Sequence, residues 1–272
     1  MGKNIEGPLY YEKMGRTGPV IAFIHPNPMD QSCWIFQMAH LSTWFRCMTI
    51  DIPGYGKSPK AKEGLSTIDI AEACWEAIDE AYPGEPAILV GCSTGSNIAP
   101  YMYHLRPEKT KALVLSGTGY SPGKEFATAR IKDYQTKGAA YRWEYTFQDF
   151  SPYFRTTPLA HYFANLFCER NDFADVNSIC YQFAAMQTQV MKDDFHSSIK
   201  APVIILTGSE DNSHQRAFLL QERIPGCELR TLPGAGHACQ IEQPWLFNRF
   251  MLEFLEKKGL MPAGPKPLRS LP

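Results

Sequence analysis

Short apolar runs alternate with amphipathic stretches along most of this chain. The runs have the length of buried strands and are bounded by Gly or Pro, and we predict strands at residues 9–13, 20–24, 47–52, 87–90, 112–115, 202–206 and 229–232. A capping signal at Ser66, followed by apolar residues at helical spacing, predicts a helix that ends near Tyr82. A second helix is predicted from Thr94 to about Leu105. The alternation indicates an α/β fold with a mostly parallel central sheet flanked by helices.

One long segment, residues 121–195, departs from that alternation. It contains no convincing strand, yet it holds 16 of the 34 aromatic residues in 75 of the 272 positions, about twice its share. We predict an inserted helical cap whose aromatic side chains pack on the main domain or line an apolar pocket. The predicted core then comprises residues 1–120 and 196–260. The Pro-rich residues 261–272 lack helical periodicity and are expected to form a tail.

Composition narrows the classes of partner. The formal net charge is −1 and the chain has no basic tract, so we expect no nucleic acid and no anionic membrane as partners. The longest apolar runs are far shorter than the roughly 18 residues that cross a bilayer. Eight cysteines form no CxxC pair, which favours a reduced, cytoplasmic setting.

The strongest chemical signal is the GxSxG sequence centred on Ser93. Gly91-Cys92-Ser93-Thr94-Gly95 lies between the predicted strand at 87–90 and the predicted helix that begins at Thr94. In such a strand-to-helix turn the serine occupies the tip, the glycines relieve crowding, and the next backbone N–H points into the same space. Ser93 is therefore the candidate nucleophile.

A serine nucleophile needs a base, and the base needs an acceptor that orients its ring. Asp211 follows the predicted strand at 202–206 and is the candidate acid, with Glu210 as a rival. His237 ends the glycine-rich loop after the strand at 229–232 and is the candidate base. The order Ser93, Asp211, His237 is that of α/β-hydrolases and differs from the orders of chymotrypsin and subtilisin.

These residues and two upstream motifs resemble the α/β-hydrolase superfamily from about residue 8 to about residue 256. His25-Pro26-Asn27-Pro28 resembles the HG-x-P oxyanion loop of that family, with Pro26 in place of the usual glycine. The segment 51–58, DIPGYGKS, resembles its D-x-P-G-x-G-x-S turn, which we expect to be structural. The resemblance implies that the backbone N–H groups of Asn27 and Thr94 stabilise the oxyanion. The Asn27 side chain either adds a further hydrogen bond there or braces its own loop.

The resemblance implies a serine hydrolase that acts on a small-molecule substrate through an acyl-enzyme. A small, largely apolar ester or lactone is the leading substrate class, and an amide, a carbamate or a C–C bond adjoining a ketone are alternatives. Two other hypotheses remain open. The Ser93-Thr94-Gly95 sequence resembles that of cofactor-free perhydrolases, and the same fold can also serve as a ligand receptor with slow turnover. Ser93 argues against dehalogenation and epoxide opening, which use an aspartate nucleophile. The histidines form no HExxH or comparable pair, and we expect neither a metal nor another cofactor.

Overall fold

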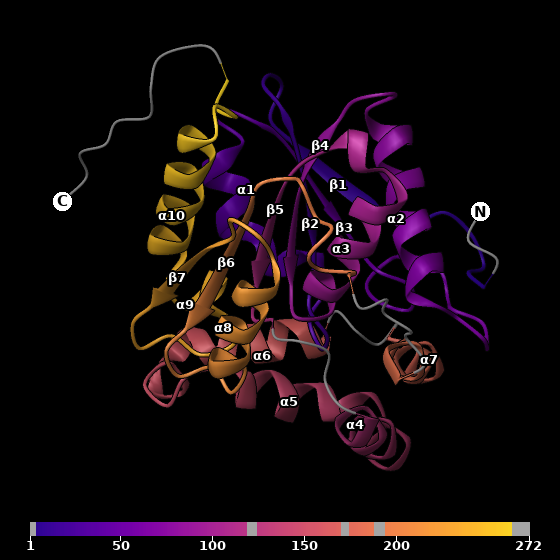
Figure 1. Cartoon of the computed structure of the whole chain (residues 1–272). Coiled ribbons are helices and arrows are strands. Elements are labelled where there is room, and N and C mark those ends of the chain that lie inside the picture. The colour runs from indigo at the N-terminus through magenta and orange to yellow at the C-terminus, as the bar shows by residue number, and fades with distance from the viewer. Residues whose placement is uncertain (1–3, 119–123, 170–173, 188–193, 263–272) are drawn as a thin grey trace.

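The computed structural model describes residues 4–118, 124–169, 174–187 and 194–262 (Figure 1). The start of the predicted cap at residue 121 lies outside these ranges, as does the predicted tail apart from Met261 and Pro262. Among the described helices, none combines the length and the apolar character that a membrane crossing requires.

A seven-stranded sheet forms the centre of the molecule. Its strands are β1 (Tyr11–Met14), β2 (Val20–Ile24), β3 (Arg46–Ile50), β4 (Ala87–Cys92), β5 (Thr110–Ser116), β6 (Val203–Gly208) and β7 (Glu228–Leu232). They follow the order β1-β3-β2-β4-β5-β6-β7. Only the β1–β3 pairing is antiparallel among these neighbours, and the others are parallel. The predicted fold class is therefore confirmed.

Helices cover both faces of the sheet, as its two-sided apolar strands require. They are α1 (Ile35–Leu41), α2 (Thr67–Ala81), α3 (Thr94–Leu105), α8 (His214–Arg223), α9 (Cys239–Glu242) and α10 (Pro244–Lys257). Buried residues of α2, α3 and α8 form one apolar cluster with the sheet, and those of α1, α9 and α10 form the other. Successive residues of β2 contribute to opposite clusters, because side chains alternate along a strand.

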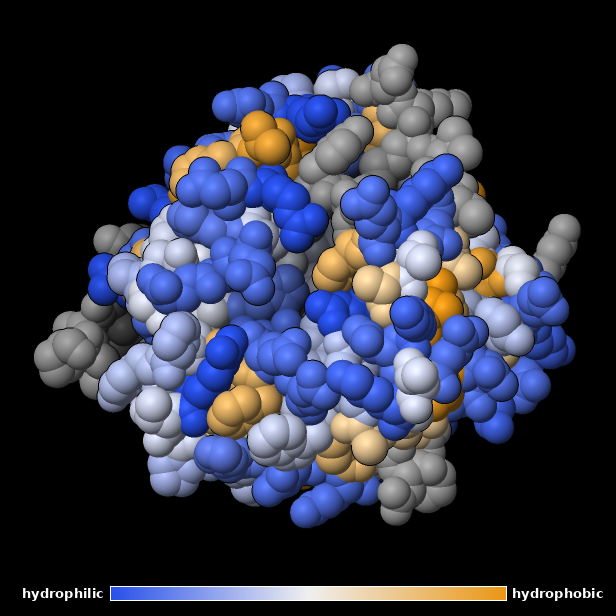
Figure 2. Space-filling view, turned by 90° about the horizontal axis from the view of Figure 1, so that it is seen from below, coloured by the Kyte–Doolittle hydropathy of each residue, from blue (hydrophilic) through white to orange (hydrophobic). Residues whose placement is uncertain are grey.

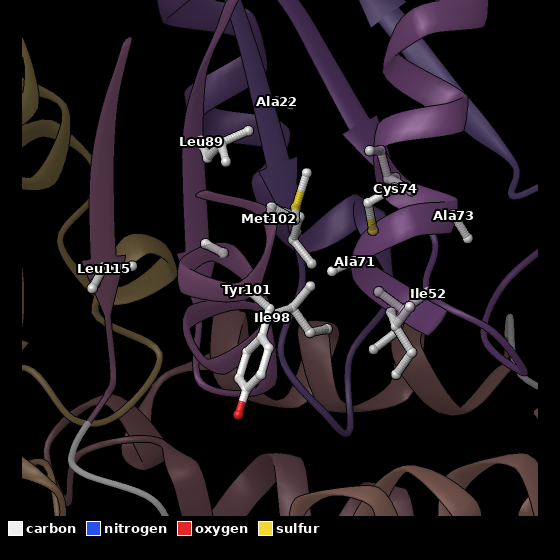
Figure 3. Packing of buried hydrophobic residues seen from close by; sticks show 14 of the residues in the cluster. Ala22, Ile52, Ala71, Ala73, Cys74, Leu89, Ile98, Tyr101, Met102 and Leu115 are labelled. Atoms are coloured by element: carbon white, nitrogen blue, oxygen red, sulfur yellow. The ribbon is translucent and has the colours of Figure 1, made fainter. Parts of the chain in front are cut away.

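The first of these clusters surrounds the strands that lead to the site. Figure 3 shows Met102 of α3 between Leu89 of β4 and Cys74 of α2, and all three are buried. The predicted capping signal of α2 is confirmed, since the Ser66 hydroxyl accepts from the backbone N–H of Asp69 and the Asp69 carboxylate accepts from the backbone N–H of Ser66. This packing fixes β4 and α3, the two elements that meet at residue 93.

Four α-helices lie between β5 and β6 in the described part of the chain. They are α4 (Lys124–Lys137), α5 (Tyr141–Asp149), α6 (Pro158–Glu169) and α7 (Val176–Gln187), and we call them the inserted helices. Figure 1 shows them gathered at one end of the sheet. Seen from that end, the surface is mainly hydrophilic with smaller apolar areas (Figure 2). Phe163 and Phe167 of α6 are buried, so these large side chains pack inward.

Candidate active site

The turn between β4 and α3 holds Ser93 in an uncommon backbone conformation. Its φ is 51° and its ψ is −109°, and no other non-glycine residue in the described ranges has a positive φ. Such a conformation costs about 1–3 kcal/mol and persists only where the surrounding structure imposes it. The structure therefore places Ser93 at a sharp strand-to-helix turn, as the GxSxG context predicts.

The two glycines of GxSxG are required by close backbone contacts. A Cβ at Gly91 would lie 2.3 Å from the carbonyl carbon of Gly95, and a Cβ at Gly95 would lie 2.1 Å from the carbonyl oxygen of Ile24. Both distances are far below a normal van der Waals contact. The turn can thus pack between β2 and α3 only with glycine at these two positions.

Hydrogen bonds tie this turn to the end of β5. The backbone N–H of Ser93 donates to the carbonyl oxygen of Ser116 over 2.8 Å. The Ser96 hydroxyl lies 2.7 Å from the carbonyl oxygen of Gly91 and accepts from the backbone N–H of Ser116 over 2.9 Å. The Ser96 side chain thus connects the turn to the neighbouring strand.

The structure brings Asp211 and His237 together. Nδ1 of His237 lies 2.9 Å from Oδ1 of Asp211, and Asp211 also accepts from the backbone N–H and the hydroxyl of Ser213, each over 2.7 Å. An ionised carboxylate only accepts, so Nδ1 carries the proton of this hydrogen bond and Nε2 faces away from Asp211. The rival Glu210 has its side chain near the Ser209 hydroxyl, and Asp211 is the residue that orients the imidazole.

Each member of this pair shifts the pKa of the other. Burial alone would raise the pKa of Asp211, but the charge of His237 and the hydrogen bonds from His237 and Ser213 hold it below its ordinary value. Burial would lower the pKa of His237, but the Asp211 carboxylate raises it above 6.5. The pair therefore favours a charged imidazole beside an ionised acid, which is the state reached when a base has accepted a proton.

The imidazole of His237 lies at the end of β5, beside the strand end that holds the Ser93 turn. A Cβ at Gly117 would lie 3.1 Å from Cε1 and 3.3 Å from Nδ1 of the ring, so the ring packs directly on the Gly117 backbone. Gly117 follows Ser116, whose carbonyl oxygen accepts from the Ser93 N–H. The predicted residues thus lie at one edge of the sheet, since Ser93 follows β4, Asp211 follows β6 and His237 lies in the loop after β7.

The loop after β2 carries Asn27, whose backbone N–H is the predicted oxyanion donor. The backbone N–H of Asn27 points at the Thr94 hydroxyl over 3.3 Å, which places it beside the residue that follows Ser93. Thr94 is the first residue of α3, where backbone N–H groups have no acceptor within the helix. The peptide bond between Asn27 and Pro28 is cis.

His25 fixes this loop rather than acting as a base. Its Nδ1 donates to the carbonyl oxygen of Pro26 over 2.9 Å, and its Nε2 accepts from the backbone N–H of Ile52 over 3.0 Å. Burial lowers the pKa of His25 to about 4, so the ring is neutral. Pro26 is accommodated because its carbonyl oxygen also accepts from the backbone N–H of Met29, which closes the turn.

The DIPGYGKS turn is structural, as predicted. The Asp51 carboxyl accepts from the backbone N–H groups of Gln31 and Lys57 over 2.9 and 3.0 Å. Tyr55 from this turn reaches the site, because its hydroxyl donates to Oδ1 of Asn27 over 2.5 Å.

Cys239 is a packed thiol that contacts the Ser116 hydroxyl at 3.2 Å, and burial raises its pKa to about 12.

The inserted helices contribute polar side chains that the sequence analysis did not single out. Tyr134 of α4 donates to Oδ1 of Asn27 over 3.0 Å. Arg142 of α5 is fully buried and donates from Nε to the carbonyl oxygen of Pro28 over 2.6 Å. Asp149, at the end of α5, accepts from the backbone N–H of His237 through its own carbonyl oxygen over 2.8 Å.

Positions 142 and 149 are seven residues apart and lie on one face of α5. Arg142 is one of the buried residues of α5, whereas Asp149 is half-buried with its Oδ2 atom enclosed, and no pattern of apolar positions marks either residue in the sequence. Burial raises the pKa of Asp149 to about 7, with the His237 charge acting against this shift and the Asp211 charge adding to it.

In the described part of the chain no three His, Cys, Asp or Glu residues gather as a metal site would require.

Comparisons with known proteins agree with this architecture. A family model for the alpha/beta hydrolase fold matches residues 19–182. The chain is 27% identical over 261 residues to the AB hydrolase superfamily protein YisY of Bacillus subtilis, covering 90% of this chain and 94% of that protein. A thermophilic esterase from Thermogutta terrifontis superposes with a TM-score of 0.81 at 20% identity, over 92% of this chain and 93% of that one. The enol-lactonase from Burkholderia xenovorans gives 0.79 at 20% identity, over 91% and 96%.

Proposed function

Because the chain belongs to the alpha/beta hydrolase family, we propose that it is a serine hydrolase that cleaves a small carboxylic ester or lactone through an acyl-enzyme intermediate. One observation carries the proposal. The Asp211–His237 pair packs on Gly117, next to the strand end that holds Ser93 in its strained turn. A strained serine, an oriented imidazole and a buried acid at one edge of a sheet are the parts that acyl transfer requires.

In the proposed mechanism the hydroxyl of Ser93 attacks the substrate carbonyl while Nε2 of His237 takes its proton. Asp211 keeps the proton on Nδ1 and stabilises the imidazolium that forms. The imidazolium then protonates the leaving oxygen, and the alcohol departs. Water activated by the same imidazole attacks the acyl-enzyme and releases the acid, which returns Ser93 to its starting state.

The backbone N–H groups of Asn27 and Thr94 are the proposed oxyanion donors. The Asn27 N–H now makes a long hydrogen bond of 3.3 Å to the Thr94 hydroxyl, which a negatively charged oxygen can replace because charge-assisted bonds are stronger. Each such donor typically contributes about 2.7–4 kcal/mol to transition-state stabilisation. We propose that the inserted helices cap this site, since α5 contacts both the Asn27–Pro28 loop and the His237 loop.

Fluorophosphonate labelling followed by peptide mapping tests the nucleophile. We expect a single label on Ser93, complete loss of labelling in Ser93→Ala, and normal labelling in Ser42→Ala, whose hydroxyl lies at the end of α1. Ser93→Ala should lower kcat by about 10⁵–10⁶-fold while its circular dichroism stays unchanged. Retained turnover in Ser93→Ala would reject the proposal.

A substrate panel tests the reaction class. Esters and lactones of graded acyl size should be cleaved faster than the corresponding amides and carbamates, because an alkoxide leaves more readily than an amide anion. Peroxide-dependent halogenation measured at the same enzyme concentration distinguishes a perhydrolase. A single burst of product without further turnover would instead favour a receptor.

A further inference from the structure

The guanidinium of Arg142 is a buried cation. The side chain is 0% exposed, and within the part of the chain that the structure describes no Asp or Glu forms an ion pair with it. Removing a guanidinium from water is costly unless charge and hydrogen bonds replace the lost solvation. A buried cation that has no acidic partner among the residues of the described ranges points to an anionic ligand.

Hydrogen bonds hold the Arg142 side chain in place, but one nitrogen of its guanidinium has no hydrogen-bond partner. Nε and Nη2 both donate to the carbonyl oxygen of Pro28, and the guanidinium lies 5.2 Å from the centre of the Tyr55 ring. Nη1 is buried and has no hydrogen-bond partner. An unpaired charged donor of this kind costs more than a neutral one, which makes Nη1 a strong site for an acceptor.

A second unpaired donor lies in the same loop. Oδ1 of Asn27 accepts from the hydroxyls of Tyr55 and Tyr134 over 2.5 and 3.0 Å, and these two bonds fix the orientation of the amide. Nδ2 of Asn27 is then buried without a partner. One unpaired donor thus belongs to Asn27 of the proposed oxyanion loop, and the other belongs to Arg142, which is hydrogen-bonded to the next loop residue, Pro28.

We propose that Arg142 and Asn27 bind a carboxylate carried by the acyl portion of the substrate. This inference rests on the proposed function. Two donors, one of them charged, match the two oxygens of a carboxylate. His237 must protonate the leaving group, so the leaving group lies on the side of α5 where Asp149 meets His237. Arg142 lies at the other end of the same helix face, beside Pro28, which is the side left for the acyl group.

The charge along α5 favours this orientation of the substrate. Arg142 and Asp149 are separated by two helical turns, about 10 Å along the helix axis. An ionised Asp149 disfavours an anionic leaving portion beside His237, whereas Arg142 attracts an anion at the opposite end. The substrate class that fits is a hemiester of a short dicarboxylic acid, or a lactone that bears a carboxylate on its acyl chain.

Two matched esters test the inference. The 4-nitrophenyl hemiester of glutaric acid and 4-nitrophenyl methyl glutarate share their acyl chain and their leaving group and differ in one charge. We expect the wild type to prefer the hemiester in kcat/KM. In Arg142→Met that preference should fall by about 10- to 100-fold, the range expected for a hydrogen bond to a charged group. Arg142→Lys should keep part of it.

The ratio of kcat/KM between the two esters separates recognition of the carboxylate from effects on folding and on the catalytic step. Any change that Arg142→Met causes in the Pro28 loop affects both esters, and so it cancels in the ratio. Arg46→Met removes an arginine that is likewise anchored to a backbone carbonyl, that of Gly18, and should leave the ratio unchanged. An unchanged ratio in Arg142→Met overturns the inference.

If Arg142→Met does not fold, the comparison of the two esters with the wild-type protein tests the inference. Faster cleavage of the neutral diester than of the hemiester would then overturn the inference. Failure of the proposed function looks different, because neither ester would then be turned over and Ser93 would not be labelled.

Discussion

The backbone N–H of His237 donates to the carbonyl oxygen of Asp149, so the last residue of α5 holds the loop that carries the proposed base. The same loop is held a second time, because Oε1 of Glu242 accepts from the backbone N–H groups of Gly236 and Ser151 over 3.1 Å each. The position of the imidazole is therefore coupled to the packing of the inserted helices. Changes at this contact should alter catalysis more than stability.

Gly236→Ala tests that coupling. A Cβ at this position would lie 2.5 Å from the backbone nitrogen of Ser151 and 2.7 Å from the carbonyl oxygen of Asp149, so the loop must move. A displacement of about 1 Å can cost 10²-fold, and we expect kcat/KM to fall by roughly 10- to 100-fold. In Gly7→Ala, where the nearest atoms are 3.9 Å away, activity should not change. Wild-type activity in Gly236→Ala would show that the contact does not position His237.

Asp211→Asn should change both the rate and its pH dependence. Loss of the carboxylate typically lowers kcat by about 10⁴-fold, because the imidazole loses its orientation and its charge partner. Only neutral His237 accepts a proton, so the rate rises with pH through the pKa of His237, which Asp211 raises above 6.5. The midpoint of kcat/KM should therefore move to lower pH in the variant. The control Glu210→Gln should keep the wild-type profile, and an unmoved midpoint in Asp211→Asn would contradict the assignment.

Asp149→Asn should stabilise the protein above pH 7. Burial raises the pKa of Asp149 to about 7, so the folded protein binds this proton more tightly than the unfolded chain does. Stability is then lost as pH rises from about 4 to 7, and an uncharged asparagine removes that loss. We expect a gain of roughly 1–2 kcal/mol in the free energy of unfolding at pH 8 and little change at pH 4. Urea titrations at both pH values measure it, with Asp133→Asn on α4 as the control.

Ser96→Ala should destabilise the turn that carries Ser93. The Ser96 hydroxyl is buried and contacts the carbonyl oxygens of Gly91 and Ser116 as well as the Ser116 N–H. Its loss leaves buried backbone groups unpaired, which costs about 1–3 kcal/mol. Ser42→Ala removes one long contact of 3.4 Å and should have a much smaller effect on unfolding. Equal stability of the two variants would mean that Ser96 does not brace the turn.

The strands and the core helices could be predicted from the sequence because their signals are local. The predicted bounds of Val20–Ile24 and Thr94–Leu105 match β2 and α3. β4 extends two residues beyond the predicted end at Val90, since Gly91 and Cys92 still pair with Leu115 and Ser116 of β5. The turn at Ser93 was thus predicted in the right place, but Gly91 and Cys92 of the GxSxG sequence belong to β4.

The polar face of α5 could not be predicted in the same way. The aromatic residues of segment 121–195 predicted a helical cap, but which residues of α5 face the site depends on how this helix packs over loops that are distant in sequence. Arg142 contacts Pro28, 114 residues away. Burial of a cation also runs against the usual preference of charged residues for solvent, so the pattern of apolar positions gave no reason to place Arg142 inside.

The two anchors of α5 make this helix a spacer of fixed length. Arg142 holds the loop of the proposed oxyanion donor, and Asp149 holds the loop of the proposed base. One inserted residue between them would turn the later anchor by about 100° and advance it by about 1.5 Å, so the two loops could no longer be gripped together. The seven-residue spacing between the two anchors of α5 thus sets the separation of the two loops that carry the proposed catalytic groups.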